Sequence, residues 1–316
     1  MRTNVINHTK FKKYSLQLLF LIIATQLTGC ISSNRIKPAP PIEEAIAIDF
    51  IDQELSGWSD LPPGIHRIPD SQVIISGHQS SGLVGVLFGP LGMLIQDGVD
   101  SSIGSSASDK SQHILNITLT NEAEKITQEL LQTSNLRKEF TTLSTPSLPQ
   151  LKVRTAVILT FVSDENVRPY VLLQASMTKP NETAPIWNTR YMSSTGAAKP
   201  LVGDGSWTEN EGVELKQYLS DNLQSSIKLM LNDVSSPYPR DENELTMVQG
   251  YYPYMRKRIQ TIGFKLTEDE NSIIYVPRLG DAMVFSGVHV MDKSLTTFRV
   301  AQPDDSFFKA LDDEPK

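Results

Sequence analysis

Residues 151–162 read Leu-Lys-Val-Arg-Thr-Ala-Val-Ile-Leu-Thr-Phe-Val, a run rich in β-branched side chains that predicts a strand. Two further strand candidates follow at residues 168–178 and 186–193, and short polar links separate the three. Short links of this kind favour antiparallel neighbours, since a parallel pair needs a long crossover. The stretch therefore predicts an antiparallel meander as the centre of the fold.

A long helix is predicted after the meander, over about residues 209–232. Thr208 and Glu211 have the spacing of a capping box at its start. Apolar residues then recur at helical spacing: Leu215, Leu219, Leu223, Ile227 and Met230 or Leu231. We expect this apolar face to pack on the sheet. A shorter helix is predicted from Asn121, with Glu124 completing a second capping box.

The segment before the meander carries weaker signals. Apolar and polar residues alternate over residues 115–120, which predicts a half-buried strand, and residues 72–76 predict a brief one. Residues 42–55 fit a helix face and a strand alternation equally, so both interpretations stay open there.

Residues 82–95 form an apolar run in which glycine recurs every three or four positions. On a helix those glycines would share a face and let another backbone approach closely. The run is too short to span a bilayer, and Pro90 interrupts it. Three interpretations remain: a buried glycine-rich helix or loop, a membrane-inserting hairpin, or a self-association surface.

The pattern changes after residues 235–240, which read Ser-Ser-Pro-Tyr-Pro-Arg and predict a boundary. Five short strand candidates follow, separated by polar turns: 246–250, 259–266, 272–276, 282–291 and 296–301. The tail from Pro303 is acidic, and its composition predicts disorder.

These patterns together predict an α+β fold with a mixed or antiparallel sheet packed by helices. The expected divisions are an α+β main domain over residues 42–234, a small β-rich C-terminal module over residues 241–301, and an acidic tail over residues 302–316. The C-terminal spacing suits a small barrel-like or sandwich module.

The chain is acidic once its first 29 residues are set aside. Those residues carry four basic side chains and no acidic one, so 25 basic residues remain against 36 acidic ones, a net charge of −11. This charge argues against non-specific nucleic-acid binding, which depends on neutralising phosphates.

The first 29 residues have the parts of a secretory signal: a basic start, an apolar run over residues 16–23 and small residues before Cys30. The apolar run is shorter than a membrane-spanning helix needs. Cys30 is the one cysteine of the chain, so the fold contains no intramolecular disulfide.

The sequence Leu27-Thr28-Gly29-Cys30 resembles the lipobox of bacterial lipoprotein precursors. The resemblance covers about the first 30 residues. It implies that the Cys30 thiol receives a diacylglycerol thioether, that residues 1–29 are removed as a signal peptide, and that the new amine is acylated with a fatty acid such as palmitate. Acylated Cys30 would then be the contact with membrane lipid. The diacylglycerol and the fatty acid together suffice for stable anchoring, since two acyl signals are enough.

Ile31, Ser32 and Ser33 follow Cys30, and no Asp stands directly after it. The resemblance then implies sorting to the outer membrane, with the body in the periplasm; display on the cell surface stays open. Residues 30–41 end in three prolines and predict an extended tether that holds the body off the membrane.

No catalytic, cofactor or metal motif stands out in the sequence. Ser80 and Ser81 lack the glycine two residues earlier that a hydrolase nucleophile elbow requires. The histidines after Cys30 (His66, His78, His113 and His289) do not lie within metal-binding spacing of one another. Residues 251–258 mix tyrosines with arginine and lysine, which indicates either a solvated edge or a contact with an anionic envelope component.

The expected function is therefore that of a non-catalytic binding or assembly subunit in the cell envelope, with an envelope protein as its partner and no cofactor. Homo-oligomerisation stays open. Two alternatives remain: an envelope hydrolase whose site is dispersed in sequence, and a membrane-inserting or oligomerising protein that uses residues 82–95.

Overall fold

The computed structural model describes residues 34–57, 60–62, 65–76, 113–143, 146–281 and 283–311. Cys30 and residues 82–95 lie outside the described residues. The helices are α4 (Thr120–Thr133) and α5 (Val213–Ser235), with short 3-10 turns η1 (Asn34–Ile36), η4 (Asn135–Lys138), η5 (Glu209–Gly212) and η6 (Lys293–Leu295). The strands are β1 (Ile46–Phe50), β2 (Ile65–Arg67), β3 (Val73–Ser76), β4 (Phe140–Thr141), β5 (Gln150–Phe161), β6 (Asn166–Thr178), β7 (Pro185–Ser194), β8 (Lys199–Pro200), β9 (Leu245–Gly250), β10 (Ile259–Glu268), β11 (Ser272–Pro277), β12 (Val288–Asp292), β13 (Thr297–Val300) and β14 (Phe308–Ala310).

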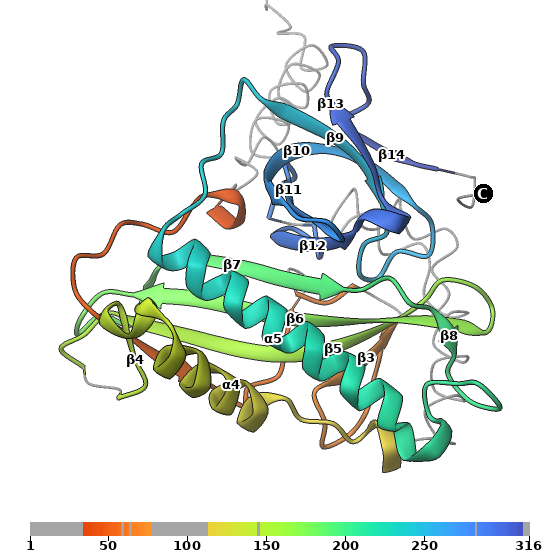
Figure 1. Ribbon diagram of the computed structural model, residues 1–316, viewed down its shortest axis with the longest axis horizontal. Helices are drawn as coiled ribbons and strands as arrows, with labels where there is room; N and C mark the ends of the chain where they lie inside the picture. Colours follow the sequence, from red (N-terminus) through yellow and green to blue (C-terminus); the bar gives the residue numbers. More distant parts are fainter. Residues whose placement is uncertain are drawn as a thin grey trace, which may run out of the picture. The chain divides into compact units, whose positions relative to one another are not determined.

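The described chain has an α+β fold with one mixed sheet of 14 strands (Figure 1). The predicted meander is confirmed, because β5, β6 and β7 pair antiparallel in chain order. β1 and β3 both add to β5 in the parallel sense, at different positions along that long strand. Within the ambiguous segment 42–55, residues 46–50 therefore form a strand, whereas residues 42–45 and 51–55 do not.

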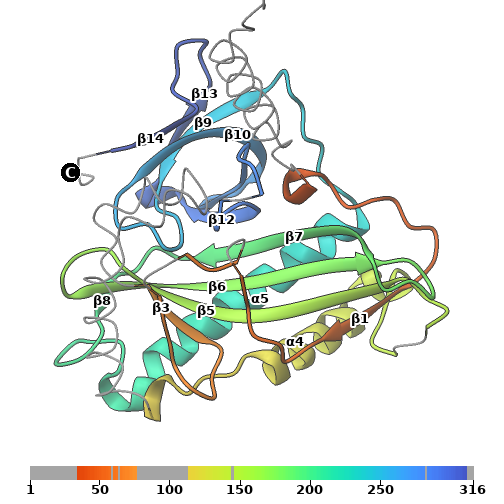
Figure 2. The same cartoon turned by 180° about the vertical axis from the view of Figure 1, so that it is seen from behind.

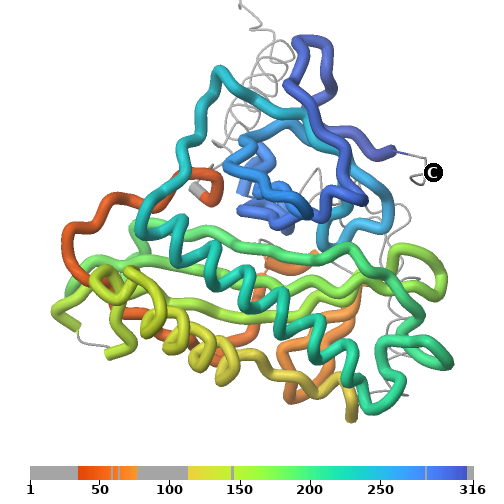
Figure 3. The backbone as a smooth tube through the Cα atoms, viewed as in Figure 1, coloured from red at the N-terminus to blue at the C-terminus, as the bar shows by residue number. Residues whose placement is uncertain are grey.

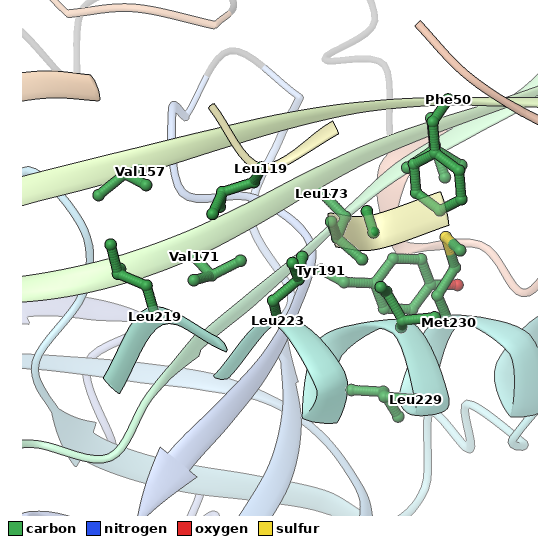
Figure 4. Packing of buried hydrophobic residues seen from close by; sticks show 14 of the residues in the cluster. Phe50, Leu119, Val157, Val171, Leu173, Tyr191, Leu219, Leu223, Leu229 and Met230 are labelled. Atoms are coloured by element: carbon green, nitrogen blue, oxygen red, sulfur yellow. The ribbon is translucent and has the colours of Figure 1, made fainter. Parts of the chain in front are cut away.

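Helices α4 and α5 cover one face of the meander (Figure 1). Val157, Val171 and Leu173 point from the strands into this layer, and Leu219 and Leu223 point back from α5 (Figure 4). The expectation that the apolar face of the long helix packs on the sheet is thus confirmed.

The opposite face of the meander is also buried. Tyr170, Leu172 and Met192 belong to a second apolar cluster with Tyr252 and Phe285 from the C-terminal strands and their loops. Burial on both faces explains why β5 reads as a nearly continuous apolar run instead of a strict alternation.

The C-terminal strands join the same sheet and curl over it, as Figures 1 and 2 show from two sides. β9, β10, β11 and β12 pair antiparallel in order, and β12 then pairs parallel with β7. The chain reaches this region through the extended link after α5, which Figure 3 traces. The strand expected over residues 282–291 is shorter and later than predicted, at Val288–Asp292.

The acidic tail is ordered further than its composition suggests. β14 pairs with β10 through residues 308–310, and Asp305 forms an ion pair with Arg299 at 2.5 Å. Pairing with β10 therefore orders residues 308–310, although the polar composition of the tail predicted disorder.

Three local predictions are wrong. Residues 113–115 form a helical turn and 116–119 have no regular structure, so the predicted strand over residues 115–120 is absent. Neither predicted capping box forms. At α4, Gln72 from outside the helix instead accepts a hydrogen bond from the Leu119 amide at 2.7 Å.

The start of α5 differs because Asn210 and Glu211 adopt left-handed backbone angles, with φ of 50° and 59°. Thr208 cannot then face the amide that a capping box would supply, and its hydroxyl donates to Leu201 O at 2.7 Å. The helix accordingly begins at Val213, four residues later than expected.

Residues 34–41 also differ from the free tether that their composition suggests. Arg35 is buried, and its carbonyl accepts a hydrogen bond from Thr189 Oγ1 at 2.6 Å. Trp187 Nε1 donates to Lys37 O at 3.1 Å. This segment therefore packs against β7.

Candidate functional site

A small pocket lies where β6 and β7 meet β12, η6 and the loop after β9. Arg168 and Tyr170 of β6 line it because they are two residues apart and so share a face of that strand. Tyr251 and His289 line it from the C-terminal half of the chain. The cavity has a volume of about 20 Å³, room for roughly one water-sized group.

Arg168 is a buried cation, with 6% of its surface exposed. Its Nε donates to Gly196 O at 2.9 Å, and its guanidinium carbon lies 4.0 Å from the centre of the Tyr251 ring. Nη1 is covered from solvent and makes no hydrogen bond to the described residues. No described carboxylate forms an ion pair with Arg168, which is unusual for a charge at this depth.

Tyr170 places a second unpartnered polar atom beside this cation. Its hydroxyl is covered from solvent and has no hydrogen-bond partner among the described residues. Burial raises the pKa of Tyr170 to about 12, although the nearby Arg168 charge works in the opposite direction. Arg168 opposes this shift through a side-chain interaction with the hydroxyl as well as through its charge, although neither Nη1 nor the hydroxyl meets the geometry of a full hydrogen bond. Burial prevails, and Tyr170 stays protonated at neutral pH.

His289 forms another wall of the pocket and is 2% exposed. Its Nε2 lies 2.6 Å from Phe285 O, so Nε2 carries the proton and donates it to that carbonyl. Burial lowers the pKa of His289 to about 4, with the carbonyl acting against this shift. The ring is therefore neutral at neutral pH.

Two other polar lining groups already have partners. Ser194 Oγ pairs with the Tyr218 hydroxyl at 2.9 Å, while the Asp292 Oδ1 atom accepts from the Ser294 amide at 2.7 Å. Ser194 and His289 thus hold different partners and do not form a nucleophile–base pair. The arrangement offers a cation and a hydroxyl donor to a small group, which suits binding of an anion.

A second cluster of buried charge surrounds Asp60, which is 5% exposed. Its Oδ1 accepts from Arg190 Nη2 at 2.8 Å, from Gln174 Nε2 at 3.1 Å and from Arg35 Nη2 at 3.3 Å. Arg154 Nη2 lies 3.7 Å from the other carboxylate oxygen. Asp60 therefore joins η1, the meander and its own loop.

Within the described part of the chain, this cluster brings together three arginines and the carboxylates of Asp60 and Asp281. Arg35 also donates through its amide to Asp281 Oδ1 at 3.0 Å, which links η1 to the C-terminal half. Burial, together with the neighbouring Arg190 charge, lowers the pKa of Arg35 to about 10. With its groups bonded to one another, the cluster functions as an internal brace.

A third buried pair closes the end of α5. Arg240 binds Asp233 through two nitrogens, at 3.1 and 3.0 Å, and Tyr191 of β7 donates its hydroxyl to the same carboxylate at 3.0 Å. The pair ties the link after α5 to the helix and the sheet, so its role is structural.

The residues singled out from the sequence have mixed outcomes. Cys30 and His78 lie outside the described residues. In the stretch 251–258, Tyr252 and Tyr254 are fully buried core residues, so the stretch is not an open aromatic binding surface. Lys257 is exposed and Arg256 and Arg258 are half-buried, so a solvated edge describes only its basic half. His66, His113 and His289 are placed apart, and no group of three metal-binding side chains occurs among the described residues.

The sequence did not single out Arg168 and Tyr170, because both residues lie inside a predicted strand. The available signal was a charged residue in a run that is otherwise almost wholly apolar, at residues 167–173. That signal cannot reveal that Tyr251 and His289, from the other half of the chain, close the pocket.

Comparison with known proteins yields no family: no family model matches the chain, and no curated protein matches it. Within the described ranges, no helix is long and apolar enough to cross a membrane.

Proposed function

We propose that this chain is a lipoprotein anchored at the outer membrane through Cys30, whose body is a non-catalytic binding or assembly subunit of the cell envelope. The observation that carries the proposal is the sequence Leu27-Thr28-Gly29-Cys30, placed directly after a basic start and an apolar run. The absence of any other cysteine in the chain agrees with a thiol reserved for lipid.

The packing of Arg35 supports a body that is held close to its anchor. Four residues separate Cys30 from Arg35, whose side chain is buried in the body. Five residue steps reach at most roughly 18 Å. A lipid on Cys30 would therefore keep the body near the bilayer, in place of the long spacer that the prolines suggest.

A binding role is supported by the Arg168 pocket. Its unpaired donors favour holding a group, and its serine and histidine are bonded to separate partners. An envelope protein that offers a carboxylate is a partner of suitable chemistry.

We further propose that residues 241–301 act as a small β-rich module built onto the main domain. The support is that β9 to β12 pair in chain order and that β12 joins the meander through its parallel ladder with β7. The module shares an apolar cluster with β5, β6 and β7, so it adds to the main domain without a separate core.

The anchor is tested by growing cells that express the chain with labelled fatty acid and isolating the protein. The wild-type protein should carry label and sediment with outer membranes, and Cys30→Ser should carry none. Ser32→Ala, which leaves the thiol in place, serves as the matched control and should stay labelled. Label retained in Cys30→Ser would contradict the proposal.

The binding role is tested by crosslinking the lipidated protein in its own envelope and identifying what is captured. A defined protein partner, lost in a variant that unfolds the body, is the expected result. Turnover of wall, lipid or peptide substrates by the purified protein, abolished by changing one polar residue, would contradict a non-catalytic role.

A further inference from the structure

We propose that the pocket between β6, β7 and β12 binds a small monovalent anion, either a halide ion or one carboxylate group, through Arg168 and Tyr170. This deepens the proposed binding role, and it is independent of lipid on Cys30.

The first argument is the uncompensated charge. A buried cation is costly unless it is paired. Three other arginines with buried side chains face carboxylates: Arg35 and Arg190 face Asp60, and Arg240 faces Asp233. Arg168 faces a carbonyl and an aromatic ring instead, at 2.9 Å and 4.0 Å. Both contacts orient the guanidinium and neither neutralises it.

The second argument is that two neighbouring donors have no hydrogen-bond partner among the described residues. Arg168 Nη1 and the Tyr170 hydroxyl are both buried and unpartnered, and both residues line the same cavity. The raised pKa of Tyr170 keeps its proton in place to donate. An acceptor that bears charge uses both donors better than a neutral one, because charge-assisted hydrogen bonds are roughly twice as strong.

The third argument sets the size and charge of the ligand. A cavity of about 20 Å³ suits one halide ion or the head of one carboxylate better than a sulfate or phosphate. Asp292 also lines the pocket, and its carboxylate repels any anion, but a dianion more strongly than a monovalent one. A single negative charge shared by Arg168 and Tyr170 fits both limits.

Gly196 supports the same geometry. Its carbonyl holds Arg168 Nε, and its φ is +83°, a conformation that L side chains rarely adopt. A Cβ there would lie 2.5 Å from Leu295 Cδ1 and 3.0 Å from Asp292 Oδ2. Glycine thus allows the chain to turn back against η6 and to present its carbonyl to the guanidinium.

The test uses the full chain purified in mild detergent, with chloride as the probe. Exchange of chloride with a protein site broadens its nuclear magnetic resonance line, and the excess width should fall when bromide or formate is added as a competitor. Arg168→Gln should lose this excess width. Tyr170→Phe should weaken competitor binding by about tenfold, the effect of one hydrogen bond to a charged group. Arg256→Gln, which changes an arginine paired with Asp164 at the surface, should behave as the wild type.

The competitors distinguish the two sources of negative charge. Displacement by bromide but not by formate assigns a halide site, and displacement by formate at lower concentration than bromide assigns a carboxylate site. Circular dichroism checks that both variants are folded. If Arg168→Gln does not fold, Tyr170→Phe still tests the proposal, because it removes only the hydroxyl and keeps the aromatic ring. Equal line widths for wild type and a folded Arg168→Gln or Tyr170→Phe variant would overturn the proposal, as would displacement by neither competitor.

Discussion

Asp60 shows how much one buried carboxylate can organise in this protein. Three guanidinium groups and one amide approach it, from η1, β5, β6 and β7. Removing its charge while keeping its shape would leave the arginines to repel one another in a poorly solvated space. The effect should be large because desolvated charges are expensive when a partner is lost.

We therefore predict that Asp60→Asn lowers the free energy of unfolding by about 3–5 kcal/mol. The matched control is Asp164→Asn, since the Asp164 side chain is 81% exposed in its pair with Arg256. An exposed pair of this kind contributes at most about 1 kcal/mol. Urea denaturation measures both variants, and an equal loss in the two would show that the Asp60 cluster is not a brace.

His289 predicts a pH dependence of stability. Burial lowers its pKa from 6.5 to about 4 in the folded state, so the folded protein binds fewer protons than the unfolded chain between these values. The stability that this group contributes is fully present above pH 6.5 and is lost as the pH falls through about 4. The difference between the two pKa values corresponds to roughly 3 kcal/mol of unfolding free energy.

Chemical denaturation of wild type and His289→Gln between pH 7 and pH 4 checks this prediction. The wild type should lose more stability than the variant as the pH falls, and the difference isolates His289 from the carboxylates that titrate in the same range. His113→Gln changes an exposed histidine and should follow the wild type. Parallel curves for wild type and His289→Gln would refute the assignment.

Among the elements, α5 depends on tertiary packing more than on its local start signals. Its predicted capping box does not form, yet the helix runs for 23 residues because its apolar face meets the meander. Leu223 is fully buried in that face, whereas Val213 at the start of the helix is 64% exposed.

Leu223→Ala should therefore cost about 2–5 kcal/mol of unfolding free energy, through lost burial and the cavity left behind. Val213→Ala, on the same helix, should change the unfolding free energy by at most about 0.5 kcal/mol. Denaturant midpoints give both values. A loss below about 1 kcal/mol for Leu223→Ala would mean that the helix does not seal this face of the sheet.

The elements also differ in how far local patterns could predict them. β5, β6 and β7 are rich in apolar and β-branched residues and were predicted within one or two residues of their ends. The alternation at residues 115–120 was misleading. Leu115 and Leu119 are buried in the core, but they belong to an irregular segment that leads into α4 and not to a strand. Short strands such as β2, β4 and β8 have no local signal, since neighbouring strands create them.

For the whole molecule, the described chain should unfold as one cooperative unit. β12 pairs with β7, Arg35 reaches Asp281, and the Tyr254 amide donates to Thr160 Oγ1 at 3.0 Å. These contacts couple the C-terminal strands to the meander, so neither half can open without exposing apolar surface of the other.

Hydrogen exchange measures this coupling. Amides of β6 and β10 should reach the same opening free energy as denaturant is added, and the short terminal strand β14 should exchange earlier by local fraying. Exchange of β10 at a clearly lower free energy than β6 would show that residues 241–301 unfold independently.

The amino-acid sequence by itself determined the antiparallel meander, the long amphipathic helix and most of the C-terminal strands, because these depend on side-chain periodicity over short stretches. It also carries the lipobox, whose role remains a prediction. The tertiary structure alone decided that the C-terminal strands continue the same sheet, that Asp60 gathers three arginines, and that Tyr251 and His289 enclose Arg168. The partners in these contacts are brought together from distant parts of the chain, and their pairing depends on which surfaces exclude water together, a property that no local pattern encodes.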